Sequence, residues 1–166
     1  MPLRQAILAS PETLSDVLVA ADDRYREAEE LLVGQHFDGC VYLLGYSVEM
    51  WLKSACLRLR NVPPFAAVKP VLGPLKSWMK GTAPHVPFTN YHDLAFLGQC
   101  VVHLRLAQGR PLAAALHAEL QRRIIVGFHD EWIVDMRYRR AALTAAEAWA
   151  ALDNAWWMKS NWTQLL

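Results

Sequence analysis

Apolar side chains recur every three or four residues along most of this chain, the spacing at which side chains share one face of an α-helix. The first such stretch begins at Ser10-Pro11-Glu12, a typical helix start, and ends at Gly34, a typical stop. The second can be capped by Asp38 and ends near Arg60, ahead of two prolines. Both stretches are predicted to be long helices.

The second stretch is apolar on nearly every side. Between Gly39 and Leu57 its only ionic groups are Glu49 and Lys53, one helical turn apart. A helix of this kind must be surrounded by its neighbours, so we predict that it is the central helix of a bundle. Gly45, inside this helix, indicates close approach of another helix or of a ligand. The polar face consists of Tyr42, Tyr46, Glu49 and Lys53, and the facing apolar stripe of Val41, Leu44, Val48, Leu52, Ala55 and Leu59.

Residues 61–90 contain many prolines and interrupt the helical pattern. We expect an irregular insertion there, with one short helical turn at Leu75–Met79. A long segment without regular structure inside a compact domain is often functional or mobile. Composition alone does not decide between these roles.

Three more helices are predicted after the insertion. Asn90, with Asp93 three residues later, resembles a capping box for a helix that ends at Gly109. Pro111 opens a fourth helix, which ends near Gly127. Thr144 and Glu147 form a capping box for the last helix, whose apolar stripe is expected at three positions. These positions are Trp149, Leu152 and Trp156. Trp156, Trp157 and Trp162 cannot all face one core, so at least one of them is expected at an interface.

No strand alternation, sequence repeat or glycine-rich phosphate loop interrupts this pattern. The 166 residues fit a single domain, which we predict to be an all-α, up-and-down bundle of four to five helices spanning 1–166. The start of the chain lacks the pattern of a signal peptide, and the longest nearly uncharged run is too short to span a bilayer. We therefore expect a soluble, cytoplasmic protein without membrane contact.

Charge and cysteine content argue against a generally basic nucleic-acid-binding protein and against a metal site built on cysteines. The formal net charge of +1 leaves no overall electrostatic footprint for nucleic acid, although arginines cluster locally at 122–123 and 137–140. The three cysteines lie in apolar contexts without metal-ligand spacing, as expected of buried thiols in a reducing compartment. His129 beside Asp130 and Glu131 lacks a second histidine-rich segment, so no metal or cofactor is expected.

Several polar residues can be interpreted in two ways. Glu49 and Lys53 are either an ordinary surface ion pair or a paired charge in a groove or dimer seam. His92 and Asp93 either satisfy backbone donors at a helix start or belong to the same pocket as Glu49. Arg137 and Tyr138 either bind a phosphate or base, or join the last loop to the central helix through Glu49.

Four segments, in order, resemble the HEPN domain (higher eukaryotes and prokaryotes nucleotide-binding). They are 25–32 (YREAEELL), 36–53 (HFDGCVYLLGYSVEMWLK), 91–94 (YHDL) and 132–138 (WIVDMRY). The resemblance implies a helical bundle that forms a homodimer, and a nucleotidyltransferase-like partner in a toxin–antitoxin-like system. Many members are metal-independent RNases in which a histidine follows an arginine after four to six residues; others are non-catalytic partners or nucleotide-binding modules.

The RNase spacing occurs here at Arg110/His117, Arg122/His129 and Arg123/His129, close to the number expected by chance. The polar residue that the family motif prefers after the arginine is absent at Arg110 and Arg123, and no histidine follows Arg137. The leading hypothesis is a binding or assembly module for a nucleotide or RNA. An RNase toxin of the same fold and a purely structural protein–protein interaction bundle are the alternatives.

Overall fold

The structure, a computed structural model, describes residues 12–128, 132 and 143–166, and within these ranges it is all-α. Its elements are α2 (Leu14–Val33), α3 (Phe37–Leu59), α4 (Lys69–Thr82), α5 (Leu94–Ala107), α6 (Ala114–Leu120), the π-helix η1 (Gln121–Phe128), α8 (Ala145–Asn161) and the 3₁₀ helix η3 (Trp162–Leu165). None of the described helices combines the length and the apolar character needed to cross a bilayer.

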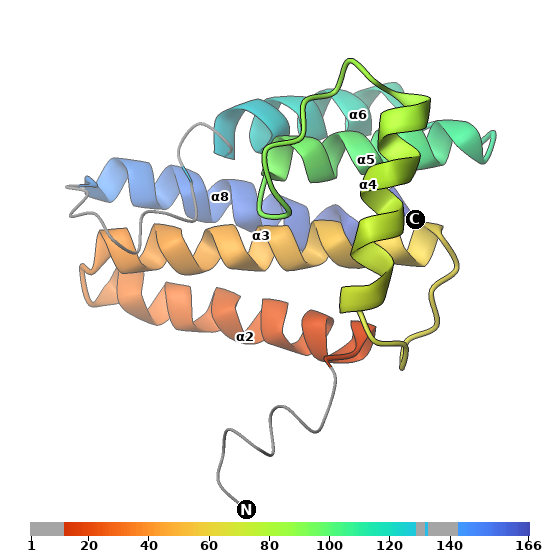
Figure 1. The fold of residues 1–166 in the computed structure, drawn as a ribbon. Helices are drawn as coiled ribbons and strands as arrows, with labels where there is room; N and C mark the ends of the chain where they lie inside the picture. Colours follow the sequence, from red (N-terminus) through yellow and green to blue (C-terminus); the bar gives the residue numbers. More distant parts are fainter. Residues whose placement is uncertain (1–11, 129–131, 133–142) are drawn as a thin grey trace, which may run out of the picture.

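Helix α3 is the central element of the fold, as its apolar sequence predicts. It forms a hairpin with α2 and also packs against α5 and α8 (Figure 1). All six residues of the expected apolar stripe are buried. Helix α4 crosses the direction of α3 at a steep angle near the C-terminal end of that helix, and it packs mainly against α5 (Figure 1).

Gly45 allows the closest approach to α3. A Cβ atom at this position would lie 2.1 Å from Nε1 of Trp132, whose side chain is only 2% exposed. The same Nε1 donates a hydrogen bond to the carbonyl oxygen of Tyr42 at 3.1 Å. The close approach expected at Gly45 is thus made by an indole ring of the chain itself.

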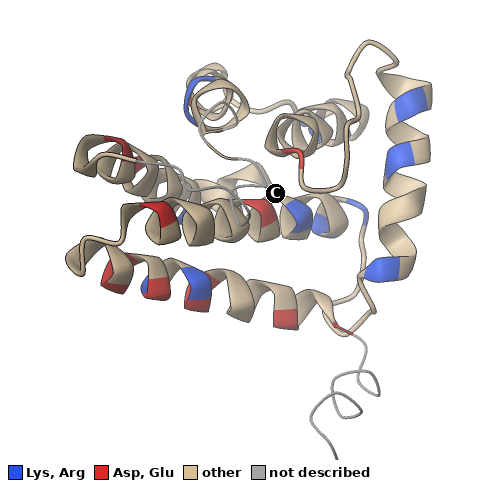
Figure 2. Cartoon of the chain, turned by 60° about the vertical axis from the view of Figure 1, so that its left-hand side comes forward, with Lys and Arg blue, Asp and Glu red and all other residues tan. Residues whose placement is uncertain are grey.

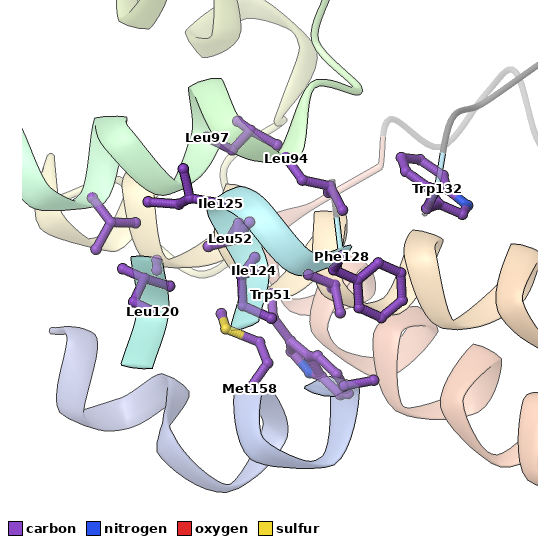
Figure 3. Close-up of a cluster of buried hydrophobic side chains, with 14 of the residues drawn as sticks. Trp51, Leu52, Leu94, Leu97, Leu120, Ile124, Ile125, Phe128, Trp132 and Met158 are labelled. Atoms are coloured by element: carbon purple, nitrogen blue, oxygen red, sulfur yellow. The ribbon is translucent and has the colours of Figure 1, made fainter. Parts of the chain in front are cut away.

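The core lies where α3, α5, η1 and α8 meet. Figure 3 shows Trp51, Phe128 and Met158 in this cluster, with aliphatic side chains between them. All three cysteines are buried, as predicted, and burial raises the pKa of the Cys40 thiol to about 11. Such thiols act as small hydrophobic groups rather than as nucleophiles.

Local capping signals were correct at some helix ends and wrong at others. Thr144 and Glu147 form the predicted capping box, and Gly34 caps the end of α2. At the start of α2 the box is formed by Thr13 and Asp16, whereas Ser10 lies outside the described residues. Asp38 does not cap α3, because the helix begins at Phe37 and Asp38 lies within its first turn; its carboxylate accepts a hydrogen bond from the backbone N–H of Leu143.

The helical turn expected at Leu75–Met79 is confirmed, but it is part of the 14-residue helix α4, so the expectation of irregular structure is wrong for the rest of residues 69–82. Pro70 lies in the first turn, where a missing N–H costs no hydrogen bond. Pro74 lies inside the helix, where proline is normally destabilising. Burial of Leu75 and Met79 against the bundle offsets that cost.

The predicted fourth helix is divided in two. It begins at Ala114 rather than Pro111, and after Leu120 it continues as the π-helix η1 to Phe128. Gly127 suits this geometry, since a Cβ there would lie 2.8 Å from the carbonyl oxygen of Arg122, five residues earlier.

The stripe predicted for the last helix is wrong at both tryptophans, whereas Leu152 is half-buried and packs against the core. Helix α8 buries a different face, made of Ala148, Ala151, Ala155 and Met158, and the small alanine side chains allow it to lie close to α3. Trp149 and Trp156 are 60% and 56% exposed. Two indole rings therefore face outward, seven residues apart on one side of α8.

Candidate functional site

The polar group on the central helix is centred on Glu49, whose side chain is 3% exposed. One carboxylate oxygen accepts a hydrogen bond from Nζ of Lys53, one turn further along α3. The other, Oε2, lies 2.9 Å from Nδ1 of His92. A buried carboxylate is costly unless it is paired, and here each oxygen has its own partner. Glu49 is therefore part of a pocket and not a surface ion pair.

His92 is held in place by the turn that leads into α5. Its backbone N–H donates to Oδ1 of Asn90 at 2.7 Å. The next residue, Asp93, is the N-cap of α5 and accepts from the backbone N–H of Phe96 at 2.9 Å. The capping residue is thus Asp93 and not Asn90 as predicted. Asn90 instead orders the turn that directs the imidazole toward Glu49.

A pocket of about 340 Å³ opens beside this group. One part of its lining is polar and consists of Tyr46, Glu49, Lys53 and His92. Two more charged residues line it, the cation Lys69 and the anion Glu12. The remaining lining is apolar and consists of Val17, Met50, Val68 and Leu72. The pocket is therefore bounded by α2, α3, the start of α4 and the turn before α5.

The arrangement has a defined hydrogen-bonding capacity. With Nδ1–H of His92 donating to the carboxylate, Nε2 of the same ring remains as an acceptor in neutral imidazole or a donor in imidazolium. The Lys53 ammonium has three donor positions, and Glu49 takes one of them. Both groups can thus bind a polar or anionic ligand while they hold Glu49.

The two tyrosines of the polar face differ in their positions. Tyr46 lines the pocket, and its ring packs edge-on against that of Trp132 at a centroid distance of 5.7 Å. The hydroxyl groups of Tyr42 and Tyr46 lie 3.0 Å apart. Tyr42 does not line the pocket and instead supports Tyr46 from the neighbouring turn.

Other sequence candidates lie apart from this pocket or outside the described range. Asp93 lines a second pocket, of about 360 Å³, on the other side of the turn. Arg137, Tyr138 and His129 fall among residues that the structure does not describe. The predicted contact of Glu49 with His92 is therefore confirmed, whereas the alternative contact with Arg137 lies outside the described residues.

The arginines of the RNase spacing have other partners or lie at the surface. Arg123 binds Glu119 through Nε at 2.7 Å and Asp153 through Nη1 at 2.5 Å, which ties η1 to α8. Hydrogen bonds from Arg122 and Arg123 hold the pKa of Glu119 at about 2. Arg110 and His117 are both exposed. A phosphate would have to compete with two carboxylates for Arg123.

The sequence reasoning missed the contribution of α4. Lys69 and Leu72 line the pocket from a segment that was expected to be irregular. Leucine and methionine four residues apart predicted one helical turn at Leu75–Met79, but the proline content argued against extending the helix back to Lys69. Among the described residues no group of three or more potential metal ligands occurs.

Comparison of the chain with family models, with curated proteins and with solved structures finds no match.

Proposed function

We propose that this protein is a HEPN-like helical binding module whose pocket beside Glu49 takes a nucleotide or the end of an RNA chain. The single observation that carries the proposal is the contact of His92 with a buried glutamate on the central helix. Two of the segments that resemble the HEPN domain, 36–53 and 91–94, supply the two side chains. A volume of about 340 Å³ lies within the range of small-ligand pockets.

The lining fits a ligand with an anionic end and a flat apolar body. Lys53, Lys69 and Nε2 of His92 are hydrogen-bond donors or cations for a phosphate. The apolar side chains of Met50 and Leu72 offer area for a base. Glu49 does not repel the phosphate strongly, because both of its oxygens already bind donors.

Calorimetric titration with adenosine, guanosine, cytidine and uridine mono- and triphosphates tests this proposal. We expect one-to-one binding of at least one of them, and a loss of about tenfold or more in affinity, roughly 1.4 kcal/mol, for Lys53→Met and for His92→Ala. His36→Ala is the matched control, since His36 is exposed and lies away from this pocket. Absence of binding to every nucleotide, or equal affinity in all variants, would overturn the proposal.

A second candidate function, protein–protein interaction, is favoured by the outward-facing Trp149 and Trp156. Exposed indole rings on one helix face are typical of interfaces. Because the HEPN resemblance implies a homodimer, we propose a second copy of this chain as the occupant of this face. A twofold axis across α8 would place Trp149 of one copy beside Trp156 of the other. A nucleotidyltransferase-like protein is the other partner that the resemblance implies.

Sedimentation velocity decides this point. We expect a dimer that dissociates in the double variant Trp149→Ser/Trp156→Ser and persists in Val33→Ser, since Val33 is 86% exposed but lies on α2. A strictly monomeric wild-type protein would remove the homodimer from the proposal. RNase activity has weaker support than either function, because Arg123 is already bound by two carboxylates.

A further inference from the structure

Charge is distributed unevenly along this nearly neutral chain. Residues 50–92 contain six of its 17 lysines and arginines and none of its 16 aspartates and glutamates. The rest of the chain carries 11 basic and 16 acidic residues. A net charge of +1 therefore conceals a basic region of 43 residues. Its charged members are Lys53, Arg58, Arg60, Lys69, Lys76 and Lys80.

Helix α4 gathers three of these lysines on one face. Lys69, Lys76 and Lys80 are seven and four residues apart, which aligns them along the helix over about 16 Å. Figure 2 shows that the charged positions of α4 are all basic, whereas those of α2 are mostly acidic. We call Lys69, Lys76 and Lys80 the α4 lysine stripe.

The stripe is available for a ligand. Among the described residues, no ion pair involves any of its three lysines. Lys69 and Lys80 are exposed, and Lys76 lies over the ring of Phe88 at 4.0 Å. By contrast, Arg24 and Arg26 of α2 are paired with acidic residues of their own helix. Cations without acidic partners on one helix face attract a polyanion.

An exposed aromatic ring lies in the connection that leads into this helix. Phe65 is 84% exposed and precedes Lys69 by four residues. Its connection is fixed to the start of α2, because the backbone N–H of Ser15 donates to the carbonyl oxygen of Pro64 at 2.9 Å. Unpaired bases stack on exposed aromatic rings near cations, and Phe65 is the exposed ring nearest in sequence to Lys69.

The stripe is continuous with the pocket described above, since Lys69 belongs to both. A ligand with one unit in the pocket can thus continue along α4 without leaving the basic surface. A single nucleotide would use only Lys69 of the stripe, whereas a chain of nucleotides would use all three lysines.

We propose that the α4 lysine stripe binds the phosphates of a single-stranded nucleic acid, with Phe65 as a stacking ring and one nucleotide of the strand in the pocket. This inference rests on the proposed function, which it extends from a nucleotide to a polymer. Stacking on Phe65 and entry of one base into the pocket both require unpaired bases, so a duplex fits less well. The contribution of these lysine–phosphate contacts to affinity comes mainly from released counterions, so the affinity is sensitive to salt.

Fluorescence anisotropy with a labelled oligouridylate of roughly 15 nucleotides tests the stripe. Each lysine that contacts a phosphate contributes about 0.7 to the slope of log K against log salt. The variant Lys69→Gln/Lys80→Gln changes only exposed side chains, so it should fold. We expect it to lower the magnitude of that slope by roughly 1.4 and to weaken binding at low salt. Arg26→Gln/Arg122→Gln removes the same charge from other surfaces and should leave the slope unchanged.

Each outcome separates the stripe from the pocket. If a mononucleotide binds but the oligouridylate binds no more tightly, the stripe is overturned and the proposed function stands. If the oligouridylate binds with a salt slope that Lys69→Gln/Lys80→Gln lowers, while no mononucleotide binds, the stripe stands without the pocket. Equal slopes in wild type and variant would contradict the stripe. So would binding to phosphatidylserine vesicles with no binding to the oligouridylate, because the surface would then be one for anionic lipid.

Discussion

The imidazole of His92 contacts the carboxylate of Glu49 across 43 positions of sequence, with Nδ1 and Oε2 2.9 Å apart. This contact joins the turn before α5 to the central helix. Lys53 completes the group from the same helix. The pocket therefore owes its polar end to a tertiary contact and not to a local motif.

Loss of the charge on Glu49 should destabilise the fold. In Glu49→Gln the Lys53 ammonium, 13% exposed, keeps its charge but loses its anionic partner. Removing one member of a buried pair costs about 3 kcal/mol or more of the free energy of unfolding. Urea denaturation measures this loss.

Glu27→Gln is the matched control for that variant. Glu27 also binds a cation on its own helix, Arg24, but both side chains are more than 40% exposed. An exposed pair contributes about 0.5 kcal/mol or less. Similar losses in Glu27→Gln and Glu49→Gln would contradict the role of Glu49 as a buried, paired charge.

Two glycine-to-alanine substitutions should change the free energy of unfolding in opposite directions. Gly45→Ala brings Cβ to within 2.2 Å of several atoms of the Trp132 indole, so the ring must move, which costs about 1–3 kcal/mol. Gly81→Ala, in the exposed last turn of α4, meets no atom within 4 Å and should stabilise the helix by up to about 1 kcal/mol.

The measurement is the free energy of unfolding of both glycine variants in urea. If Gly45→Ala were as stable as the wild-type protein, Trp132 would not pack against this turn of α3. If Gly81→Ala were destabilised, this part of residues 69–82 would not be a regular helix.

Stability should also depend on pH through His103. Burial, and then the charge of His85, lowers the pKa of His103 from 6.5, and the two rings lie 5.9 Å apart. Below about pH 6.5 the unfolded chain binds a proton at this residue before the folded protein does. The free energy of unfolding therefore falls as the pH is lowered through this value, and His103 contributes no pH dependence well above it.

Urea denaturation between about pH 7.5 and pH 5.5 measures that dependence in wild type and in His103→Gln. His103→Gln should lose part of the pH dependence of the free energy of unfolding, whereas His36→Gln, at an exposed position, should retain the full dependence. Identical pH profiles for wild type and His103→Gln would show that His103 is not desolvated in the fold.

Much of the fold could be predicted, because some of its signals are local in the sequence and because one helix carries almost no charge. The uncharged faces of α3 required neighbours on all sides, and Thr144 with Glu147 marked the start of α8 without any tertiary information. Only one turn of α4 was predicted, because the prolines are a local signal against a helix, whereas burial of Leu75 and Met79 against the bundle favours the full helix. Trp149 and Trp156 were misplaced because large aromatic residues are expected inside, whereas close packing of α8 favours alanine.

The candidate site was only partly predictable for the same reason. Glu49 and Lys53 could be found from the absence of other charges on their helix, and His92 from its place at a helix start. The contribution of Lys69 and the apolar wall at Leu72 required α4 to be recognised as a helix. The basic character of 50–92 was present in the sequence, but the net charge of the whole chain concealed it.

The most direct test of the central claim is the imidazole spectrum of His92 during nucleotide titration. In protein labelled with ¹⁵N-histidine and assigned with His92→Ala, we expect a protonated Nδ1 in the free state, because this atom donates to Glu49. Addition of the nucleoside monophosphates should shift the Nε2 resonance of His92 and leave that of His36 unchanged. A nucleotide that binds without any change at His92, or a complete absence of binding, would contradict the assignment of this pocket as the ligand site.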